Sequence, residues 1–123
     1  MFVVAIGGAL GSGKSTLARL IIKSFSNPRI VPFAYPLKKA AVDLGWDGKK
    51  DKKGRRLLQL LGTELGRECI NQDIWVNKWD TQRSIAKNDQ RDILIADDMR
   101  FQNELDLILK VRGTTIKMIG RDS

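Results

Sequence analysis

Residues 8–15 form a glycine-rich loop, Gly-Ala-Leu-Gly-Ser-Gly-Lys-Ser, that matches the phosphate-binding pattern G-x-x-x-x-G-K-S. An apolar run at residues 2–6 precedes the loop and predicts a buried strand, and an amphipathic segment at 16–25 follows it and predicts a helix. A phosphate loop needs this arrangement, because glycines let backbone N–H groups turn inward around an anion and the helix adds its positive end. A glycine-rich turn with a surface lysine is the alternative, and it leaves the flanking strand and helix unexplained.

The loop makes ATP or GTP the first ligand to expect. Lys14 is expected to reach the β- and γ-phosphates, and the Ser15 hydroxyl is expected to bind Mg²⁺. The residues expected to contact the nucleotide all lie in the loop or directly after it: Gly8, Gly11, Ser12, Gly13, Lys14, Ser15 and Thr16.

The composition favours one domain with an anionic partner. A chain of 123 residues can build a single hydrophobic core, and its net charge of +8 suits nucleotides, nucleic acid or acidic surfaces. Cys69 is the only cysteine and histidine is absent, so an internal disulfide and histidine chemistry are excluded, and Cys69 is expected to be a small buried side chain. The chain has no membrane-spanning run and no signal-like start, which predicts a soluble protein of the reducing cytoplasm.

A basic run at residues 49–56 holds much of the excess positive charge. It is either a solvated, mobile loop or a segment that recruits phosphate groups, and both interpretations stay open. A nucleic-acid-binding module ranks lower, because the chain has no DNA-reading motif and its tyrosine and phenylalanine residues are not interleaved with this run.

The order of predicted elements is strand, helix, strand, a long helical middle, strand, helix, strand, which is typical of a parallel sheet covered by helices. We therefore expect one α/β domain over residues 1–123, a three-layer α/β/α fold of the P-loop type with about four parallel strands. The middle, at about residues 36–90, is the only part large enough for a second substrate pocket. Near the end, Asn103 is expected to cap a helix that Gly113 ends, before a strand at 114–119.

The helical middle begins after a short second strand. The elements predicted in this region are a strand at 29–34 and helices that begin at Pro36, span 55–68 and span 74–86. Lys38 lies in the first turns of the first helix, and Asp73 is the expected N-cap of the third. Trp75 and Trp79 lie one turn apart on that third helix, where core packing is the default interpretation and base stacking the alternative.

Two acids end the third predicted strand, at residues 93–96. Because the carboxyl ends of parallel strands line the ligand crevice, Asp97 and Asp98 are expected to face the bound phosphates, where one of them can hold Mg²⁺ directly or through water. The alternative is an Asp-Asp turn without a metal, although two adjacent acids are difficult to place unless a cation or an arginine is near.

Three further segments are similar to motifs of the deoxynucleoside monophosphate kinases that many bacteriophages encode. Residues 33–38, Phe-Ala-Tyr-Pro-Leu-Lys, resemble the family's F-A-x-P-L-K, residues 58–67 resemble L-Q-x-x-G-T-E-x-x-R, and residues 98–104 resemble D-x-R-F-x-N-E. They occur in the family's order and cover nearly the whole chain, which makes the resemblance far more specific than the phosphate loop alone.

The resemblance implies transfer of the γ-phosphoryl group of ATP to a deoxynucleoside monophosphate (dNMP), giving the diphosphate (dNDP) and ADP, with Mg²⁺ as the metal cofactor. Such transfer depends on alignment and charge neutralisation, so the absence of histidine is no obstacle. The residues expected to be catalytic are Lys14, Arg67, Asp98 and Arg100. Ser15 with Asp98, or with Asp97, is expected to place the metal. For each arginine, a structural salt bridge is the alternative role.

The resemblance also implies that the insertion at about 36–90 binds the acceptor. The residues expected around the acceptor are Tyr35, Lys38, Gln59, Glu64, Arg67, Trp75 and Arg100. The cations among them would grip the acceptor phosphate or the transferring group, since guanidinium forks match phosphate oxygens. Tyr35 and Trp75 would border the base, and Gln59 or Glu64 would contact its edge.

The chain departs from the family pattern at two places. Family members usually continue past the fourth strand with a region that closes over the substrate, whereas this sequence stops at Ser123. A shortened C-terminus and a sequence that continues beyond Ser123 are both open interpretations, and Arg121 is the one candidate for a closing-region arginine. In the basic run, Arg55 and Arg56 both fit the family's arginine before L-Q.

Two hypotheses follow from different classes: an ATP-dependent dNMP kinase, and an ATP-binding protein without efficient transfer. The expected partners are small molecules, ATP and a dNMP; no membrane is expected, and nucleic acid ranks low as a partner. A homodimer through an exposed face of the tryptophan helix is compatible with the pattern. The expected location is the cytoplasm, which is the host cytoplasm if a phage encodes the chain.

Overall fold

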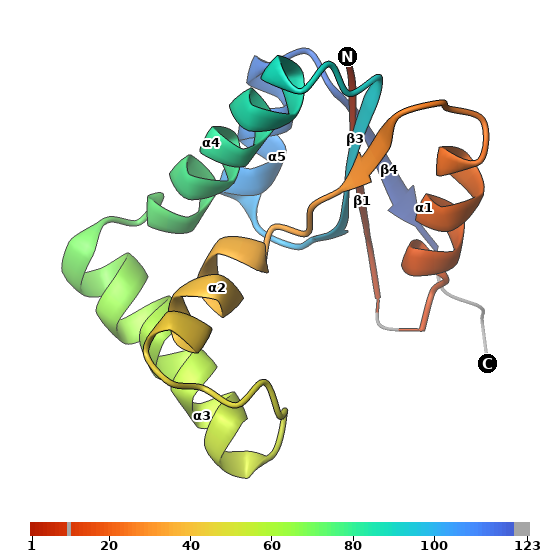
Figure 1. The fold of residues 1–123 in the computed structure, drawn as a ribbon. Helices are drawn as coiled ribbons and strands as arrows, with labels where there is room; N and C mark the ends of the chain where they lie inside the picture. Colours follow the sequence, from red (N-terminus) through yellow and green to blue (C-terminus); the bar gives the residue numbers. More distant parts are fainter. Residues whose placement is uncertain (10, 120–123) are drawn as a thin grey trace.

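The computed structural model describes residues 1–9 and 11–119, so Leu10 of the loop and Arg121 of the tail lie outside the described residues. The elements in chain order are β1 (Phe2–Gly8), α1 (Lys14–Ile22), β2 (Pro28–Ile30), α2 (Tyr35–Asp43), α3 (Lys52–Gln59), the π-helix η1 (Leu60–Ile70), α4 (Ile74–Asn88), β3 (Ile93–Met99), α5 (Gln102–Lys110) and β4 (Thr114–Met118) (Figure 1). Among the described residues, no helix combines the length and the apolar character needed to cross a membrane.

The four strands form one parallel sheet in the order β2-β3-β1-β4. Helix α1 packs on one face of the sheet, and α4 and α5 pack on the other (Figure 1). This confirms the predicted three-layer α/β/α fold of the P-loop type and the four-stranded parallel sheet. Because all strands run the same way, their carboxyl ends meet at one edge, which carries the loop after β1 and the acids of β3.

Alternate residues of β1 and β3 belong to different cores, as the two-residue period of a strand requires. Those on the side of α4 and α5 are Val3, Ala5, Leu94 and Ala96, and those on the side of α1 are Ile6, Ile93 and Ile95. Both faces of these two strands are therefore covered, which is why their sequences are continuous apolar runs rather than alternating ones.

Between β2 and β3 the chain leaves the sheet as a helical arm, formed by α2, α3 and η1 (Figure 1). The arm has its own small core around Ala41, Leu61 and Trp75, the last of which is contributed by the start of α4. Helix α4 therefore belongs to two layers, since its first turn closes the arm and its later turns cover the sheet.

The two tryptophans of α4 are both core residues, as the default interpretation predicts. Trp79 is fully buried, with its ring centroid 4.6 Å from that of Phe33, and its indole N–H donates to the Val31 carbonyl at 2.8 Å. Trp75 is 8% exposed, and its indole N–H donates to the Gly62 carbonyl at 2.9 Å. One turn of α4 thus fixes the arm to the sheet through two buried indoles.

The prediction of a single α-helix at 55–68 is wrong in its bounds, and only the first part of this segment is α-helical. It starts earlier, at Lys52, because the Asp51 carboxylate caps α3 by accepting the Gly54 N–H at 2.8 Å. From Leu60 the chain continues as the π-helix η1. Glycine is needed at position 66 of η1, because an added Cβ would lie 2.8 Å from the Trp75 indole nitrogen. Wide π-helical turns occur often at functional sites.

The second strand is shorter than the 29–34 predicted, since β2 covers Pro28–Ile30. The Val31 N–H still donates to the Ile95 carbonyl of β3 at 2.9 Å. Pro32 has no N–H to continue the ladder, so pairing ends there.

The prediction that Asn103 caps the last helix is wrong. Helix α5 starts at Gln102 with Phe101 at the N-cap, and the Asn103 amide instead donates to the Asp73 carboxylate at 3.0 Å. Asp73 does occupy the predicted N-cap position of α4, but no side-chain capping hydrogen bond is formed. The two side chains thus join the starts of α4 and α5.

Two other local predictions are also wrong. Helix α5 ends at Lys110, and the left-handed conformation falls on Arg112, with φ 60°, rather than on Gly113. Gly113 is small for a different reason, because a Cβ there would lie 2.9 Å from the Val3 carbonyl oxygen. Cys69 is exposed rather than buried, because it lies in the exposed last turn of η1.

Candidate functional site

The phosphate loop connects β1 to α1 at the carboxyl edge of the sheet. Gly11 and Gly13 adopt positive φ angles of 79° and 90°, which glycine reaches without a steric penalty, and Gly13 is the N-cap of α1. Gly8 allows a close approach, since an added Cβ would lie 2.7 Å from the Met118 carbonyl oxygen. The backbone therefore has the tight curvature of a loop that wraps an anion at a helix N-terminus.

The side chains of the loop also suit a phosphate ligand. Lys14 Nζ donates to the carbonyl oxygens of Gly8 at 2.6 Å and Ala9 at 3.1 Å, which holds the ammonium group against the loop. The Ser12 hydroxyl is buried and has no hydrogen-bond partner within the described part of the chain. A buried hydroxyl is normally paired, and a phosphate oxygen would satisfy it. Thr16 lies exposed in the first turn of α1.

The two acids of β3 have different partners. Ser15 Oγ donates to Asp97 Oδ2 at 3.3 Å, so Asp97 lies beside the phosphate loop. Asp98 accepts the backbone N–H groups of Phe33 at 2.7 Å and Ala34 at 3.0 Å, so its two oxygens anchor the β2–α2 connection. Both oxygens of Asp98 are thus engaged, whereas the Asp97 carboxylate faces the loop.

Adjacent side chains of a strand point to opposite faces, which separates the two acids, and the pairing of β3 with β1 is irregular at the same place. Ala5 pairs with Ala96, but Gly7 pairs with Met99, so β3 carries an extra residue at the position of the acids. Such a bulge redirects side chains and is common beside active sites.

Ser15 and Asp97 supply the kind of ligands that Mg²⁺ prefers, a hydroxyl and a carboxylate oxygen. Among the residues described, no three His, Cys, Asp or Glu side chains form a cluster that would cage a metal by themselves. Magnesium beside a nucleotide needs no such cage, because phosphate oxygens and water complete its octahedron. The donor set therefore fits a metal that arrives with a nucleotide.

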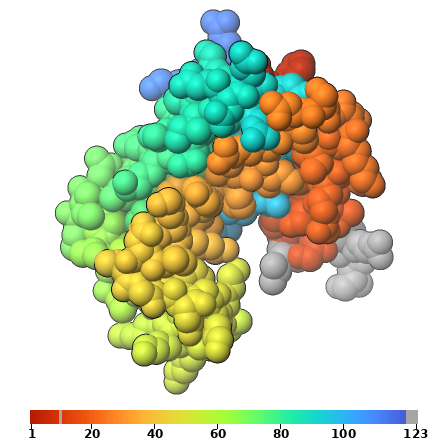
Figure 2. Space-filling model, viewed as in Figure 1, coloured from red at the N-terminus to blue at the C-terminus, as the bar shows by residue number. Residues whose placement is uncertain are grey.

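A small cavity of about 60 Å³ lies where the helical arm meets the ends of β2 and β3. It is lined by Phe33, Ala34, Leu37, Arg67, Trp75, Asp98, Arg100, Phe101 and Glu104. The structure thus brings together four of the residues expected from the sequence: Arg67, Trp75, Asp98 and Arg100. Figure 2 shows the surface hollowed between the arm, in yellow and green, and the side of the molecule that carries the phosphate loop, in red and orange.

Other expected residues lie outside this cavity. Tyr35 lines a different cavity, of about 270 Å³ between α2 and α4. Gln59 is exposed at the end of α3, where its amide donates to Thr63 Oγ1 at 3.3 Å, and Glu64 is exposed on η1. The structure therefore does not bring Tyr35, Gln59 or Glu64 together with the two arginines, whereas Trp75, the other proposed base contact, lines the same cavity as they do.

Arg67 from η1 and Arg100 from the β3–α5 connection share one aromatic partner. The guanidinium carbon of Arg67 lies 3.7 Å from the centroid of the Phe101 ring, and that of Arg100 lies 4.9 Å from it. Neither guanidinium forms an ion pair with a carboxylate in residues 1–9 or 11–119. The structural salt bridge weighed as an alternative role for each arginine is thus not found in the described part of the chain.

Glu104 fixes the backbone that carries Arg100. Glu104 is buried, with 6% of the residue exposed, and its Oε1 accepts the N–H groups of Arg100 at 2.8 Å and Phe101 at 3.0 Å. Burial raises the pKa of Glu104, and these two hydrogen bonds oppose that rise. A buried acid at this turn therefore orders the connection between β3 and α5.

Lys38 on α2 has a second cation beside it. Burial lowers the pKa of Lys38, the neighbouring ammonium of Lys50 lowers it further, and Asp98 and Asp97 act in the opposite direction. Lys50 belongs to the basic run, so one residue of that run lies beside Lys38, on the side of the molecule that carries Asp97 and Asp98. Two ammonium groups placed together favour an anion between them.

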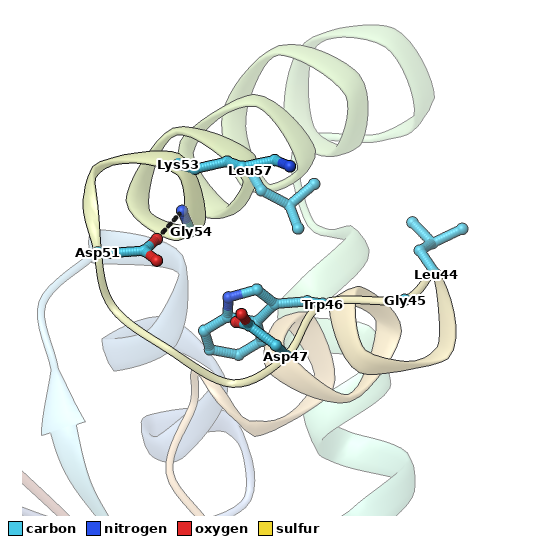
Figure 3. Close-up of a pocket in the computed structure, with 8 residues that line it drawn as sticks. All are labelled: Leu44, Gly45, Trp46, Asp47, Asp51, Lys53, Gly54 and Leu57. Atoms are coloured by element: carbon cyan, nitrogen blue, oxygen red, sulfur yellow. Dashed lines mark hydrogen bonds between the residues drawn. The ribbon is translucent and has the colours of Figure 1, made fainter.

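The basic run is also folded rather than loose at its start. The Trp46 indole N–H donates to the Lys49 carbonyl at 3.0 Å, and the Lys49 N–H donates to Asp47 Oδ1 at 2.9 Å. Figure 3 shows Leu57 of α3 pointing toward the Trp46 ring across a cavity of about 280 Å³. These contacts fix the segment that places Lys50.

Comparison with known proteins identifies two viral relatives. No family model matches the chain. It is 44% identical over 54 residues to the "Deoxynucleoside-5'-monophosphate kinase" of Escherichia phage T5, a match that covers 44% of this chain and 20% of that protein. It is 27% identical over 143 aligned residues to the "Putative deoxynucleotide monophosphate kinase" of Acanthamoeba polyphaga mimivirus, covering 96% of this chain and 74% of that protein.

The chain has homologues named deoxynucleotide monophosphate kinases. This confirms the resemblance stated from its motifs. The match to the phage T5 protein spans about a fifth of that protein's length, so the activity, substrates and partners of the whole protein come to this chain as proposals.

Three residues of the site were not predicted from the sequence: Lys50, Phe101 and Glu104. Glu104 had a local signal, because an acid three residues after a helix start is the second half of a capping box. Lys50 had none beyond the general charge of its run, since its position depends on how the segment folds around Trp46.

Proposed function

We propose that the chain is an ATP-dependent kinase that transfers the γ-phosphoryl group of ATP to a deoxynucleoside monophosphate, giving a dNDP and ADP. The observation that carries the proposal is the pair Arg67 and Arg100, which line a cavity without a carboxylate partner in the described chain. This cavity shares the carboxyl edge of the sheet with the phosphate loop. Guanidinium groups arranged in this way suit a phosphate.

The donor is held by the loop in this proposal. Backbone N–H groups of the loop, the N-terminus of α1 and Lys14 bind the ATP phosphates, and the Ser12 hydroxyl gains the partner that it lacks. Ser15 and Asp97 would hold Mg²⁺, which neutralises charge on the phosphates. Asp98 acts indirectly, because its bonds to Phe33 and Ala34 set the start of α2 and hence Lys38.

The acceptor is held on the other side of the same edge. Arg67 and Arg100 bind the acceptor phosphate, with Lys38 and Lys50 adding positive charge nearby. An oxygen of the acceptor phosphate attacks the γ-phosphorus as the bond to the β-phosphate oxygen breaks, and ADP leaves. The protein supplies alignment and cations, which is most of what phosphoryl transfer requires.

Of the four residues proposed to contact the base, Trp75 alone lines the cavity that holds Arg67 and Arg100. Trp75 borders the cavity with its N–H already bonded to Gly62, so it would present a ring edge or face to the base. Gln59, Glu64 and Tyr35 would have to move toward the cavity to contact it. The proposed location is the cytoplasm, where ATP and dNMPs are present.

The direct test is incubation of the purified chain with Mg-ATP and each dNMP in turn, with dNDP and ADP separated by chromatography. The kinase proposal predicts dNDP and ADP in equal amounts from at least one acceptor. ATP binding with no product from any acceptor would favour the alternative, an ATP-binding protein without transfer.

Lys14→Ala is the first variant to test, with Lys23→Ala as its control at the exposed end of the same helix. Loss of the loop ammonium is expected to reduce dNDP formation by about a hundredfold or more, because a charge on the transferring phosphate loses its partner. Lys23→Ala should leave the rate unchanged. Equal activity of the two variants would contradict the assignment of the loop.

A further inference from the structure

Phe101 contacts both arginines of the proposed acceptor site. Arg67 and Arg100 come from different elements, η1 and the β3–α5 connection, yet their guanidinium carbons lie 3.7 Å and 4.9 Å from the centroid of this one ring. We propose that Phe101 is a positioning residue, whose ring holds Arg67 and Arg100 together so that both can bind one acceptor phosphate. The inference rests on the proposed function and adds the residue that organises its cationic pair.

Holding two guanidinium groups at one site costs free energy. They repel each other, and each ends a long side chain that loses conformational entropy when it is fixed. The negative face of an aromatic ring attracts a cation at these distances. A ring also leaves the guanidinium N–H donors free, whereas a carboxylate would occupy them and compete with the phosphate.

The structure assigns no other partner to these cations. In the part of the chain that the structure describes, neither guanidinium donates a hydrogen bond or forms an ion pair. The buried acid Glu104 accepts the N–H groups of Arg100 and Phe101 through Oε1, and the charge of Arg67 lowers the pKa of Glu104 without an ion pair between the two side chains. The Phe101 ring is therefore the contact that the two side chains have in common.

Phe101 is itself held in place from both sides along the chain. Glu104 fixes its N–H at 3.0 Å, and Asp98, at the end of β3, is fixed to the backbone of the β2–α2 connection. Phe101 is 37% exposed as a residue and lines the cavity, so it is not a core residue whose loss would unfold the domain. A partly exposed ring that contacts two cations is better explained by their placement than by burial.

The test compares Phe101→Leu, which keeps the apolar bulk, with Phe101→Tyr, which keeps the ring. Phe2→Leu is the matched control, since Phe2 is 66% exposed at the opposite end of the sheet. Phe101→Leu is expected to raise the KM for the dNMP by about tenfold, while the KM for ATP changes less than about twofold. Phe101→Tyr should restore the wild-type KM, and Phe2→Leu should not change it.

A second measurement follows the arginines without turnover. The Nε–Hε NMR signals of Arg67 and Arg100 should be displaced by the ring current of Phe101 in the wild type and in Phe101→Tyr, and should return toward ordinary values in Phe101→Leu. Both signals should move together when a dNMP is added to the wild-type protein. Assignment uses Arg67→Lys and Arg100→Lys.

The outcomes separate the two levels of the proposal. If the wild type makes dNDP and Phe101→Leu keeps the wild-type KM for the dNMP, the positioning role is wrong and the kinase stands. If the wild type makes no dNDP from any acceptor, the kinase is wrong, and the NMR signals decide the positioning role. Signals without a ring-current displacement, or unmoved by every dNMP, would then overturn it too.

Discussion

The two halves of the candidate site are built in different ways. The loop half comes from consecutive residues between β1 and α1, with Asp97 as its one distant member. The arginine half is assembled from η1, α4 and the segments around β2 and β3, which meet only through long-range packing. Local backbone geometry is sufficient to form the first half, whereas the second depends on how the helical arm lies against the sheet.

The adjacent acids show the same contrast within two residues. Asp97 bonds to Ser15 of the loop half, and Asp98 bonds to the backbone at Phe33 and Ala34 of the arginine half. Because adjacent residues of a strand point to opposite faces, one strand end serves both halves. Substitutions at these residues either remove one half of the site or weaken the contacts that hold it in place.

Asp97→Asn is expected to have the largest effect, a decrease of about a thousandfold in kcat for dNDP formation with little change in stability. The reason is loss of the carboxylate that would hold Mg²⁺ beside the phosphates. The measurement is the rate as a function of Mg²⁺ concentration, where the variant should need more metal. A variant with wild-type kcat and metal dependence would remove Asp97 from the loop half.

Arg67→Ala and Arg100→Ala are expected to lower kcat/KM for the dNMP by about a hundredfold each, since each removes a donor from the acceptor phosphate. Lysine at either position should restore only part of the activity, because an ammonium group lacks the planar fork. ATP affinity, measured by calorimetry, should be unchanged. Arg19→Ala, an exposed change on α1, is the control; an equal loss there would show that net charge alone matters.

Asp98→Asn is expected to destabilise the fold by about 1–3 kcal/mol, because the amide can accept only one of the two backbone N–H groups that Asp98 binds. Urea denaturation measures this change. Asp106→Asn, at an exposed position on α5, should be close to neutral. Wild-type stability in Asp98→Asn would mean that the β2–α2 connection is held by other contacts.

Glu104→Gln is expected to have the smallest effect, and a pH-dependent one. Its carbonyl oxygen can keep both hydrogen bonds, since both go to Oε1. Burial raises the pKa of Glu104, so the folded protein holds this proton more tightly than the unfolded chain does, and wild-type stability falls as pH rises between the two pKa values.

The glutamine variant lacks that titration, so its free energy of unfolding should decline less than the wild type's as pH rises above the ordinary pKa of glutamate. Thermal or urea unfolding across the acidic range measures the difference. Parallel pH profiles for the two proteins would contradict a raised pKa for Glu104.

Much of the fold was predictable because its signals are local. The glycines of the loop require positive φ angles, and the apolar runs of β1 and β3 predict buried strands, which the structure confirms. The separate partners of Asp97 and Asp98 were not predicted, because both acids were expected to face the phosphates and their hydrogen bonds join segments far apart in the sequence. Strand alternation alone would have suggested that the two acids point in different directions.

The helical arm was predicted less well. The start of α3 was missed because the capping role of Asp51 was not recognised, and the π-helix was missed because propensity does not distinguish it from an α-helix. Phe101 was part of a motif without a role, since its contact with Arg67 joins segments far apart in the sequence. Cys69 was wrongly predicted to be buried, because composition does not show which face of a helix is covered.

The central claim is that the loop half and the arginine half form one site that joins two nucleotides. The most direct test supplies ATP labelled with ³²P in its γ-phosphate, together with Mg²⁺ and a dNMP, and measures which product carries the label. The account predicts that the label appears in the dNDP, in a one-to-one ratio with ADP. Label that stays in ATP, or appears only as inorganic phosphate, with every dNMP would contradict it.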